Sequence, residues 1–528
     1  GGVDLSNAAD FVAAGAVAVF YLAVLAWLPR RDAPARIAAA FAALLIAVNP
    51  TFWSQALLAE VYALHALFIA TFLLLTGRHS QSPNLPISQS PLPFSPSSLL
   101  PLSLLLGLAL THHRTSLFLL PGFLLWLLWR QNQNADSTDF ADFRRFLSVL
   151  IRPIPSTGSG DVLSLPKGHR RVIRVLSPRQ WAAIVAGLAL PQLLYLYVPL
   201  RSGPDASPWL YPRLGDATLA LYTPTFQGFI EFVTGSVFAV SFLSPAQALA
   251  RIPEAANLWL VHFTWPGLAL AAFGLLFLLR GAISREDSNA DSTDKIRIPF
   301  DPRIQKSTRH KSGSLLLLTL PAFALLQVFN LFYGIGDIYV FYIPLYLIAG
   351  LWAAYGIYWL IGLTGRRHLS FTIHYSPFTI RTALWSLLLF TLPVSLFITH
   401  LPAIDRSGDD SARRMWDAIL AAPPPDDAIL VSNDRNEIVP LYYVQAVEGR
   451  AAGVTGLFPL LTPEERFADV AAVTETALAG GERPVYLVKE MPGLGVKFAM
   501  AQATPPLIRV LAPVGEGALE QRLDLAYG

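Results

Sequence analysis

Long apolar runs constrain this chain more than any other feature of its sequence. Ten runs of 14 to 24 residues have interiors free of Lys, Arg, Asp and Glu, and polar segments separate them. A helix needs about 20 apolar residues to cross the hydrocarbon core of a bilayer. Within that core every backbone N–H and C=O must be paired, and a helix pairs them inside its own segment. The sequence therefore predicts an α-helical polytopic membrane protein.

The predicted spans fill most of residues 1–400, which we interpret as one transmembrane domain. They cover 8–28, 37–50, 61–77, 98–111, 115–129, 180–198, 257–279, 314–333, 339–362 and 381–399. The connections near 78–97, 130–179 and 280–313 are polar, and the first is rich in Ser and Pro. We expect these three connections to be disordered.

Basic residues are divided unequally between alternate connections. Lys and Arg number 24 in 29–36, 78–97, 130–179, 280–313 and 363–381, but 4 in 1–7, 51–60, 112–114, 199–256 and 334–338. Cytoplasmic loops of membrane proteins carry the excess of these residues. We therefore expect the first set to face the cytoplasm, across a plasma or inner cell membrane, and the second set to lie outside.

Residues 401–528 have a different composition, and we expect them to form an extracytoplasmic domain. SARRMWDAILAA is helix-like, AILVSND and PVYLVKE read as strands, and a helix is expected near 463–480. Alternating helices and short apolar strands predict a small α/β domain. Asp434 follows the predicted strand 428–432. We interpret it as a helix cap, with a ligand contact as the alternative.

Composition also narrows the classes of partner. A net charge of +3 gives no reason to expect nucleic acid, and the absence of cysteine excludes disulfides and thiolate chemistry. A transporter would place ionisable groups near the membrane midplane. Here His65 and His262 are the titratable side chains of the span interiors, and the charged residues collect at the outer ends. This pattern favours binding or chemistry at the outer surface.

The segment from Asn49 to Tyr62 is the strongest candidate site. It contains Trp53, Gln55, Glu60 and Tyr62, and Glu60 stands at the start of a predicted span. An acidic residue there could simply complement the helix dipole. Alternatively, its carboxylate could bind an acceptor, a metal or a cation at the outer surface. Spacing alone leaves both open.

Two further outer segments could bind phosphate. His112, His113 and Arg114 form a short polar segment between two apolar runs, and Arg201 is an outer cation directly after a span. Arginine offers a planar fork of donors that suits phosphate. A wet hairpin turn explains the first group equally well, and snorkelling to lipid headgroups could explain Arg201.

The last candidate is the turn Tyr333-Gly334-Ile335-Gly336-Asp337-Ile338-Tyr339. Two glycines and an acid make a tight outer turn, from which Asp337 and Tyr339 could reach a substrate. Capping of the following helix is the alternative role for Asp337.

Together these motifs resemble a known family. They are NPTFWSQALLAEVYALHALF, GLALTHHRTSLFLLPG, YVPLRS, LGDATL with FVTG, and GDIYVFYIPLY. In this order they resemble the domain-of-unknown-function 2723 family, whose members are similar to protein O-mannosyltransferases of the GT-C glycosyltransferase class. The similarity runs from about Asn7 to Trp352, with a looser match through the tail.

The resemblance implies transfer of a sugar from a polyprenyl-phosphate donor to a protein or glycan acceptor on the outer face. Family members carry an acidic motif in the first outer loop, and its Asp has the principal catalytic role. This chain begins at Gly1, after that loop, so we expect it to be incomplete. Glu60 matches the second acidic position of the family. His113, Arg201 and Asp337 match polar positions of its outer face.

The leading hypothesis is thus a GT-C-like membrane glycosyltransferase. Glu60 and Asp337 are its catalytic candidates. The substrate-binding candidates are Trp53, Gln55, Tyr62, His112, His113, Arg114, Arg201 and Tyr339. The sequence identifies no certain cofactor, and a divalent metal stays open. The alternatives are a non-catalytic membrane protein that binds envelope glycans and, less favoured, a lipid or solute transporter.

Overall fold

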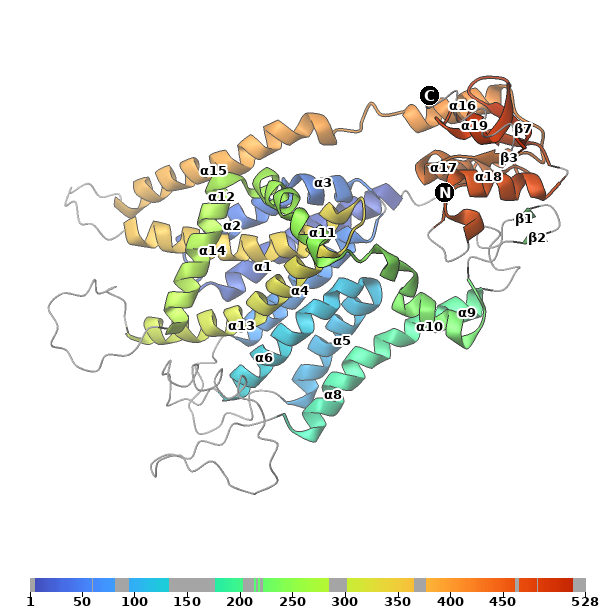
Figure 1. The fold of residues 1–528 in the computed structure, drawn as a ribbon. Helices are drawn as coiled ribbons and strands as arrows, with labels where there is room; N and C mark the ends of the chain where they lie inside the picture. Colours follow the sequence, from blue (N-terminus) through green and yellow to red (C-terminus); the bar gives the residue numbers. More distant parts are fainter. Residues whose placement is uncertain are drawn as a thin grey trace. The chain divides into compact units, whose positions relative to one another are not determined.

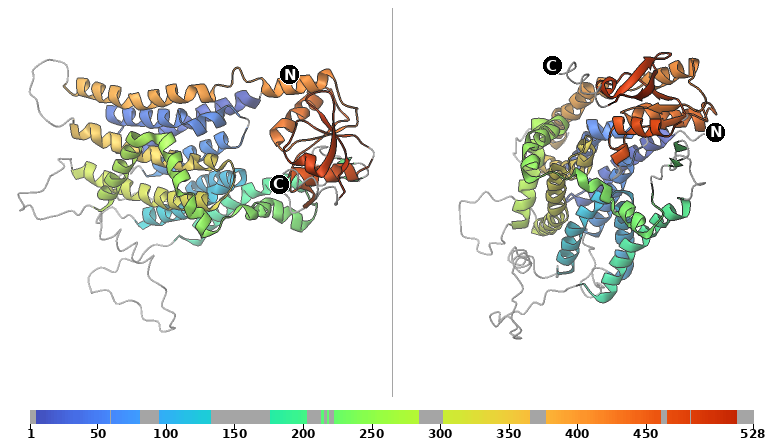
Figure 2. Two further views of the ribbon diagram at one scale, coloured as in Figure 1. Left: turned by 45° about the horizontal axis from the view of Figure 1, so that its top comes forward. Right: turned by 45° about the vertical axis from the view of Figure 1, so that its right-hand side comes forward.

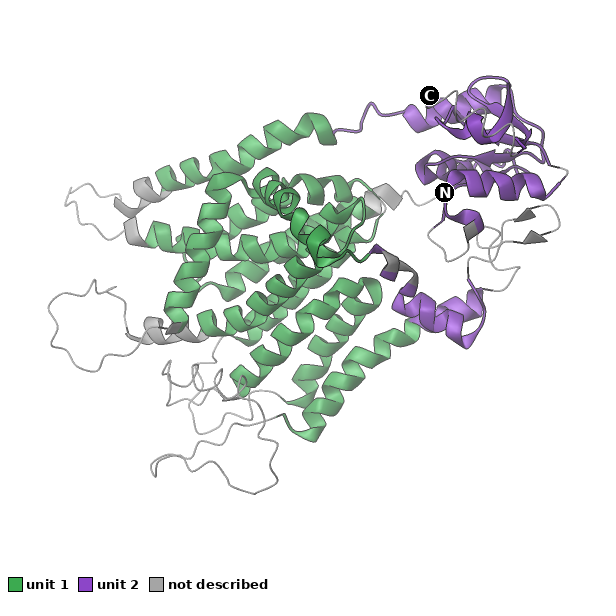
Figure 3. Cartoon of the chain, viewed as in Figure 1, with its two compact units in different colours: residues 1–194, 242–404 green, residues 195–241, 405–528 purple. Residues whose placement is uncertain are grey.

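The computed structural model describes residues 5–58, 60–80, 95–132, 176–202, 213–214, 217–218, 222–283, 302–364, 377–460, 465–481 and 483–515. Most of each connection predicted to be disordered (78–97, 130–179 and 280–313) lies outside these residues. The chain divides into two compact units (Figure 3). We call residues 1–194 and 242–404 the helical unit, and residues 195–241 and 405–528 the second unit.

Helices make up the described part of the helical unit (Figure 1). The α-helices are α1 (Leu5–Trp27), α2 (Ala33–Ala47), α3 (Pro50–Ala56), α4 (Tyr62–His79), α5 (Pro96–His112), α6 (Leu119–Asn132), α8 (Pro178–Ala189), α11 (Pro245–Ala250), α12 (Ile252–Ile283), α13 (Pro302–Phe332), α14 (Ile343–Thr364) and α15 (Pro377–Ile404). Short 3₁₀ helices are η2 (Arg114–Phe118), η3 (Leu190–Leu196) and η5 (Ile338–Tyr342). Each of the ten predicted apolar runs falls on helical structure.

Six helical segments within the described residues are long and apolar enough to cross a membrane, or seven if the bent pair α2 and α3 counts as one span. The six are Ala9–Trp27, Pro178–Arg201, Pro245–Ala282, Lys311–Phe332, Ile338–Gly362 and Ala383–Ile404. The helix α5 is apolar but shorter. The chain is therefore a multi-pass helical membrane protein, and the total of ten spans stays a prediction.

Two predicted connections contain helix where none was expected. The connection 51–60 begins with α3, which is bent by 66° from α2. Pro50 takes the first position of α3, where a missing N–H costs nothing, and the Asn49 side chain accepts from the N–H of Phe52. The connection 280–313 was also predicted wrongly at its end, because α13 starts at Pro302 and continues through polar residues into its apolar part.

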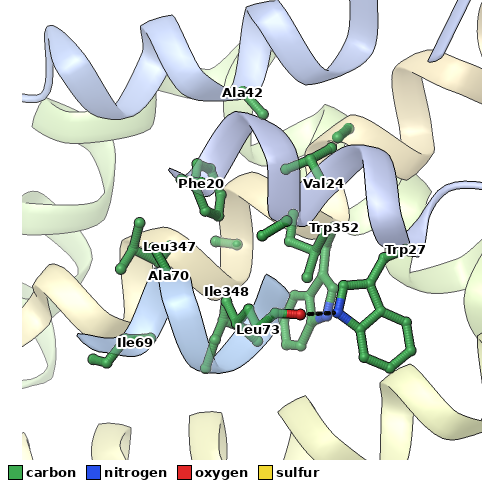
Figure 4. Packing of buried hydrophobic residues seen from close by; sticks show 14 of the residues in the cluster. Phe20, Val24, Trp27, Ala42, Ile69, Ala70, Leu73, Leu347, Ile348 and Trp352 are labelled. Carbon is green, nitrogen blue, oxygen red and sulfur yellow. Dashed lines mark hydrogen bonds between the residues drawn. The ribbon is translucent and has the colours of Figure 1, made fainter. Parts of the chain in front are cut away.

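The core of the helical unit packs α1 against α4, and α14 against α2 and α12 (Figure 2). Side chains such as Phe20, Ala42, Ala70 and Leu347 fill the space between these helices (Figure 4). In the same close-up the indole N–H of Trp27 donates to the carbonyl of Leu73, with 2.8 Å between N and O.

The C-terminal end of α1 is held by donors from distant helices. Lys311 Nζ donates to the carbonyl of Leu28 at 2.8 Å, and the hydroxyl of Tyr355 donates to the carbonyl of Trp27 at 2.6 Å. The last carbonyls of a helix have no partner within it. Buried Lys311 and Tyr355 supply those partners and so fix α13 and α14 against α1.

Glycines let α12 and α14 approach closely. A methyl group added at Gly274 would lie 1.7 Å from the carbonyl oxygen of Trp352, and one at Gly356 would lie 2.3 Å from that of Leu270. Small residues at such crossings are typical of membrane helices, whose association depends on close van der Waals packing. The contact therefore depends on the absence of side chains at these two positions.

Gly274→Ala should destabilise the helical unit by about 1–3 kcal/mol or more, because the added methyl forces α12 and α14 apart. The measurement is the thermal unfolding midpoint of the full chain in detergent. Gly15→Ala is the matched control, since an added methyl there meets nothing within 4 Å. Equal midpoints for the two variants would contradict the close packing of α12 on α14.

The second unit contains an α/β fold in its C-terminal part. Its described helices are α9 (Tyr197–Arg201), α10 (Phe226–Thr234), η4 (Ser236–Ser241), α16 (Ser411–Ala421), α17 (Arg435–Ala446), η6 (Glu465–Phe467), α18 (Val470–Ala479) and α19 (Leu494–Lys497). Its described strands are β1 (Arg213–Leu214), β2 (Ala217–Thr218), β3 (Ile429–Val431), β4 (Thr455–Leu457), β5 (Val485–Leu487), β6 (Phe498–Gln502) and β7 (Ile508–Pro513).

The sheet of this fold has five strands among the described residues, in the order β4-β3-β5-β7-β6. The strands β4, β3 and β5 are parallel, whereas β7 is antiparallel to β5 and β6. The helix expected at SARRMWDAILAA and the strands expected at AILVSND and PVYLVKE are present as α16, β3 and β5. Asp434 caps α17 by accepting from the N–H of Asn436 at 2.8 Å. The interpretation of Asp434 as a helix cap is therefore confirmed.

Candidate functional site

Connections predicted to lie on one side of the membrane meet at one end of the helical unit. At the predicted outer end, the His112 ring hydrogen-bonds through Nε2 to the carbonyl of Val61, and the Tyr62 ring lies 5.7 Å from that of His113. At the opposite end, Arg130 donates to the carbonyl of His79. The helix order thus separates the two sets of connections, as expected if the helices cross a membrane in alternation.

Side chains from three parts of the sequence gather at the predicted outer end. We call this group the outer cluster. It consists of Glu60, Tyr62, His65, His113, Arg114, Thr115, Ser116, Tyr333, Asp337, Tyr339 and Phe341. Glu60 precedes α4, and Tyr62 and His65 belong to its first turn. The next four come from η2 and the residue before it, and the last four from the segment between α13 and α14, which includes η5.

The centre of the outer cluster is a pair of stacked imidazoles. The rings of His65 and His113 lie 4.4 Å apart, and the Phe341 ring is 5.3 Å from that of His113. Buried Thr115 bridges the pair, with its hydroxyl oxygen 2.7 Å from His113 Nδ1 and 3.3 Å from His65 Nε2. The backbone is extended at His113, between α5 and η2, and Thr115 in η2 is within hydrogen-bonding distance of both rings.

His113 favours a neutral ring at physiological pH. Burial lowers the pKa of His113 to about 4, and the neighbouring His112 and Arg114 act in the same direction. Neutral His113 can hydrogen-bond to a substrate or position one, but it does not supply positive charge. Among the candidates of this segment, that task falls to Arg114, whose side chain is exposed.

Two carboxylates stand around Tyr62. Glu60 and Asp337 are exposed, and both lie near enough to the Tyr62 hydroxyl to act on it electrostatically, as does Tyr339. Neither carboxylate caps a helix through a hydrogen bond. The N-cap of α4 is Val61, and Asp337 occupies the N-cap of η5 without a side-chain bond to its backbone. Hydrogen-bond capping, the alternative role considered for Asp337, therefore does not explain its presence.

Arg114 completes the charged part of the cluster. Arg114 and Asp337 both act electrostatically on the Tyr333 hydroxyl, so cation and carboxylate share one neighbourhood. His112 is directed elsewhere, toward the Val61 carbonyl. Of the three residues interpreted as a phosphate-binding group, Arg114 thus lies in the neighbourhood of Asp337, while His112 and His113 contact Val61 and His65 at the start of α4.

Other sequence candidates lie outside this group. Trp53 stacks on Phe397 of α15, with ring centroids 5.2 Å apart, and Gln55 is buried in α3. Packing accounts for both positions, and a role in substrate binding stays a prediction. Arg201 ends α9 in the second unit and is exposed there. Its role in substrate binding also stays a prediction.

Arg251 was not among the sequence candidates, yet it holds the turn that carries Asp337. Its Nη1 donates to the carbonyl of Tyr333 at 2.6 Å, and its Nε pairs with Glu254 at 3.0 Å. The contact caps the end of α13. The sequence did contain a signal that could have identified this residue. Arg251 is one of the few basic residues in the connections predicted to lie outside.

Within the described residues, no group of three or more His, Asp and Glu side chains could hold a metal ion. The outer cluster joins two carboxylates, one guanidinium, imidazoles and phenols at the end of a helical bundle.

Comparison with known proteins adds a family relationship for one part of the chain. Residues 4–136 match the family model described as the protein O-mannosyl-transferase TMEM260 N-terminal domain. This segment extends from α1 to α6 and includes Glu60, Tyr62, His65, His113 and Arg114. The similarity to that domain thus covers the N-terminal part of the helical unit.

No curated protein matches the chain. A solved structure that does is the crystal structure of ArnT from Cupriavidus metallidurans in the apo state. The two sequences are 12% identical, the TM-score is 0.40, and the match covers 96% of this chain and 83% of that chain.

The low pKa of His113 predicts a pH-dependent stability. The unfolded chain would protonate His113 near pH 6.5, the folded chain only near pH 4. Stability should therefore be greatest above pH 6.5 and fall as the pH is lowered toward 4. His113→Gln should remove up to about 1.4 kcal/mol per pH unit of this slope. The measurement is the unfolding midpoint of both proteins in detergent between pH 7 and 5. If the midpoint of the variant fell with pH as steeply as that of the wild type, the low pKa of His113 would be contradicted.

Proposed function

We propose that this protein is a membrane glycosyltransferase of the GT-C type. It would transfer a sugar from a polyprenyl-phosphate donor to a hydroxyl group of a protein or glycan acceptor. The observation that carries the proposal is the overlap of the mannosyltransferase family match with the elements that build the outer cluster. Glu60, Tyr62, His65, His113 and Arg114 all belong to the matched segment.

The chemistry of the cluster fits such a transfer. A carboxylate near the acceptor can take the proton of its hydroxyl as the new bond to the anomeric carbon forms. The bond from that carbon to the phosphate oxygen breaks, and polyprenyl phosphate leaves. A cation then stabilises the charge on the departing phosphate. Glu60 and Asp337 are the candidates for the first task, and Arg114 is the candidate for the second, with Arg201 as a further cation.

The placement of the cluster suits a lipid-linked donor. The lipid tail stays in the bilayer, so the phosphate must react at the level of the headgroups. The cluster lies at helix ends and joins exposed charged groups to the aromatic rings of Tyr62 and Phe341. Aromatic residues at this depth are typical of membrane interfaces. We infer from the distribution of Lys and Arg that this end faces outward and that the domain after residue 400 is extracytoplasmic.

Glu60→Gln and Asp337→Asn test the carboxylates. Each should lower sugar transfer by about 10²–10⁴-fold if its carboxylate is the base, because the amide cannot accept the proton. Transfer from radiolabelled polyprenyl-phosphate mannose to membrane proteins, in proteoliposomes that contain the protein, measures this. Glu231→Gln is the matched control, since that exposed carboxylate lies on α10 and bonds to Gln227.

Wild-type transfer in both Glu60→Gln and Asp337→Asn would remove the two residues from the reaction. A wild-type protein that retains glycan without transferring sugar would instead support the binding-protein alternative. Protease accessibility of the C-terminal domain in sealed vesicles provides a separate check of the proposed orientation.

A further inference from the structure

A buried polar pair lies between α3 and α12. The hydroxyl oxygen of Thr51 is 2.6 Å from His262 Nε2, and His262 Nδ1 is 2.5 Å from the carbonyl of Leu258. Because a carbonyl only accepts, Nδ1 carries the proton and donates to Leu258. Nε2 can then accept from the Thr51 hydroxyl. A neutral His262 ring therefore has both nitrogens paired.

Two unpaired polar groups flank this pair. The Tyr346 ring stacks on His262 with centroids 4.6 Å apart, and its buried hydroxyl has no hydrogen-bond partner among the described residues. Asn49 precedes Thr51 by two residues and has no exposed surface. Its Oδ1 accepts from Phe52, but its Nδ2 is unpaired within the same described part of the chain. We call Asn49, Thr51, His262 and Tyr346 the His262 network.

The backbone beside the network is also irregular. Thr264 interrupts α12 with φ 55° and ψ 171°, a region of backbone space that is nearly restricted to glycine. Pro266 follows, and it has no N–H to give to the carbonyl of His262. Residues held in such conformations cluster at functional sites. The irregular backbone and the unpaired side chains therefore coincide at one place in the bundle.

Unpaired buried polar groups need an explanation, because each has lost its hydrogen bonds to water without gaining a partner in the protein. In native proteins the partner is commonly an ordered water or a ligand. The His262 network contains no Lys, Arg, Asp or Glu, so a phosphate or an ammonium group would lack a counter-charge there. Uncharged hydroxyl groups fit better, since a hydroxyl can accept from the Asn49 amide, and one can donate to or accept from the Tyr346 hydroxyl.

We propose that the His262 network is a buried subsite for an uncharged, hydroxyl-bearing group, namely the sugar of the lipid-linked donor. This inference rests on the proposed function. The network also lies near the parts that carry the outer cluster, because α3 packs against η5 and Tyr346 belongs to the helix that follows η5. Water has the same hydrogen-bonding chemistry as a sugar hydroxyl, so the test must distinguish the two.

Two variants remove one unpaired group each. Tyr346→Phe deletes only the hydroxyl, and Asn49→Ser removes the amide nitrogen while keeping an oxygen that can cap α3. Tyr355→Phe is the matched control, because its hydroxyl already donates to the Trp27 carbonyl at the opposite end of the helical unit. Without lipid, Tyr346→Phe should melt at or above the wild-type temperature, and Tyr355→Phe below it.

The experiment compares unfolding midpoints of the full chain in detergent with polyprenyl phosphate and with polyprenyl-phosphate mannose. The mannose-bearing lipid should raise the midpoint of the wild type further than the lipid without sugar. That sugar-dependent increment should be lost in Tyr346→Phe and in Asn49→Ser, and kept in Tyr355→Phe. An equal increment in all four proteins, or none in the wild type, would overturn the proposal and leave water as the occupant.

The transfer assay separates this inference from the proposed function. The wild type could transfer sugar while the additional rise in midpoint caused by mannose did not depend on Tyr346. That result would overturn the subsite but not the proposed glycosyltransferase function. A Tyr346-dependent increment without any transfer would support the subsite and overturn the transferase.

Discussion

Pairing of backbone and side-chain polar groups inside an apolar bundle is the constraint on which the helical unit depends. The end of α1 is the clearest case, because its carbonyls face the interior rather than water. Lys311 from α13 and Tyr355 from α14 donate to Leu28 and Trp27, and the indole of Trp27 donates to α4. The carbonyls at this helix end would be costly to bury without partners. The hydrogen bonds that pair them, together with that of the Trp27 indole, connect α1 with α4, α13 and α14.

The same constraint explains where chemistry can occur. Charged side chains are expensive within the bilayer, so Glu60, Arg114 and Asp337 stand at helix ends, where they are exposed. Polar residues that lie deeper are neutral or paired, as His65 is by Thr115 and His262 is by Thr51. The charged groups of the outer cluster are therefore exposed, whereas the groups of the buried His262 network are uncharged.

Sequence reasoning identified the helices well, because apolar runs and turn residues act locally. It located the helix break at His113 and the cap at Asp434. It missed α3, since a Pro that can end a helix can also begin one, and it missed the polar start of α13, where helix formation does not depend on apolar residues. Among the candidates, Glu60, Tyr62, His113, Arg114, Asp337 and Tyr339 lie together, whereas Trp53 packs against Phe397.

The sequence by itself determined that this chain is built of membrane helices followed by an α/β domain, and that its acidic and basic residues lie outside the interiors of the apolar runs. These properties follow from hydrophobic runs and charge counts along the chain. Only the tertiary structure decided which groups meet. Thr51 and His262 are 211 positions apart, and Asp337 and Tyr62 are separated by still more of the sequence. Such pairings depend on helix packing, and close approaches such as that of Gly274 to α14 fix them.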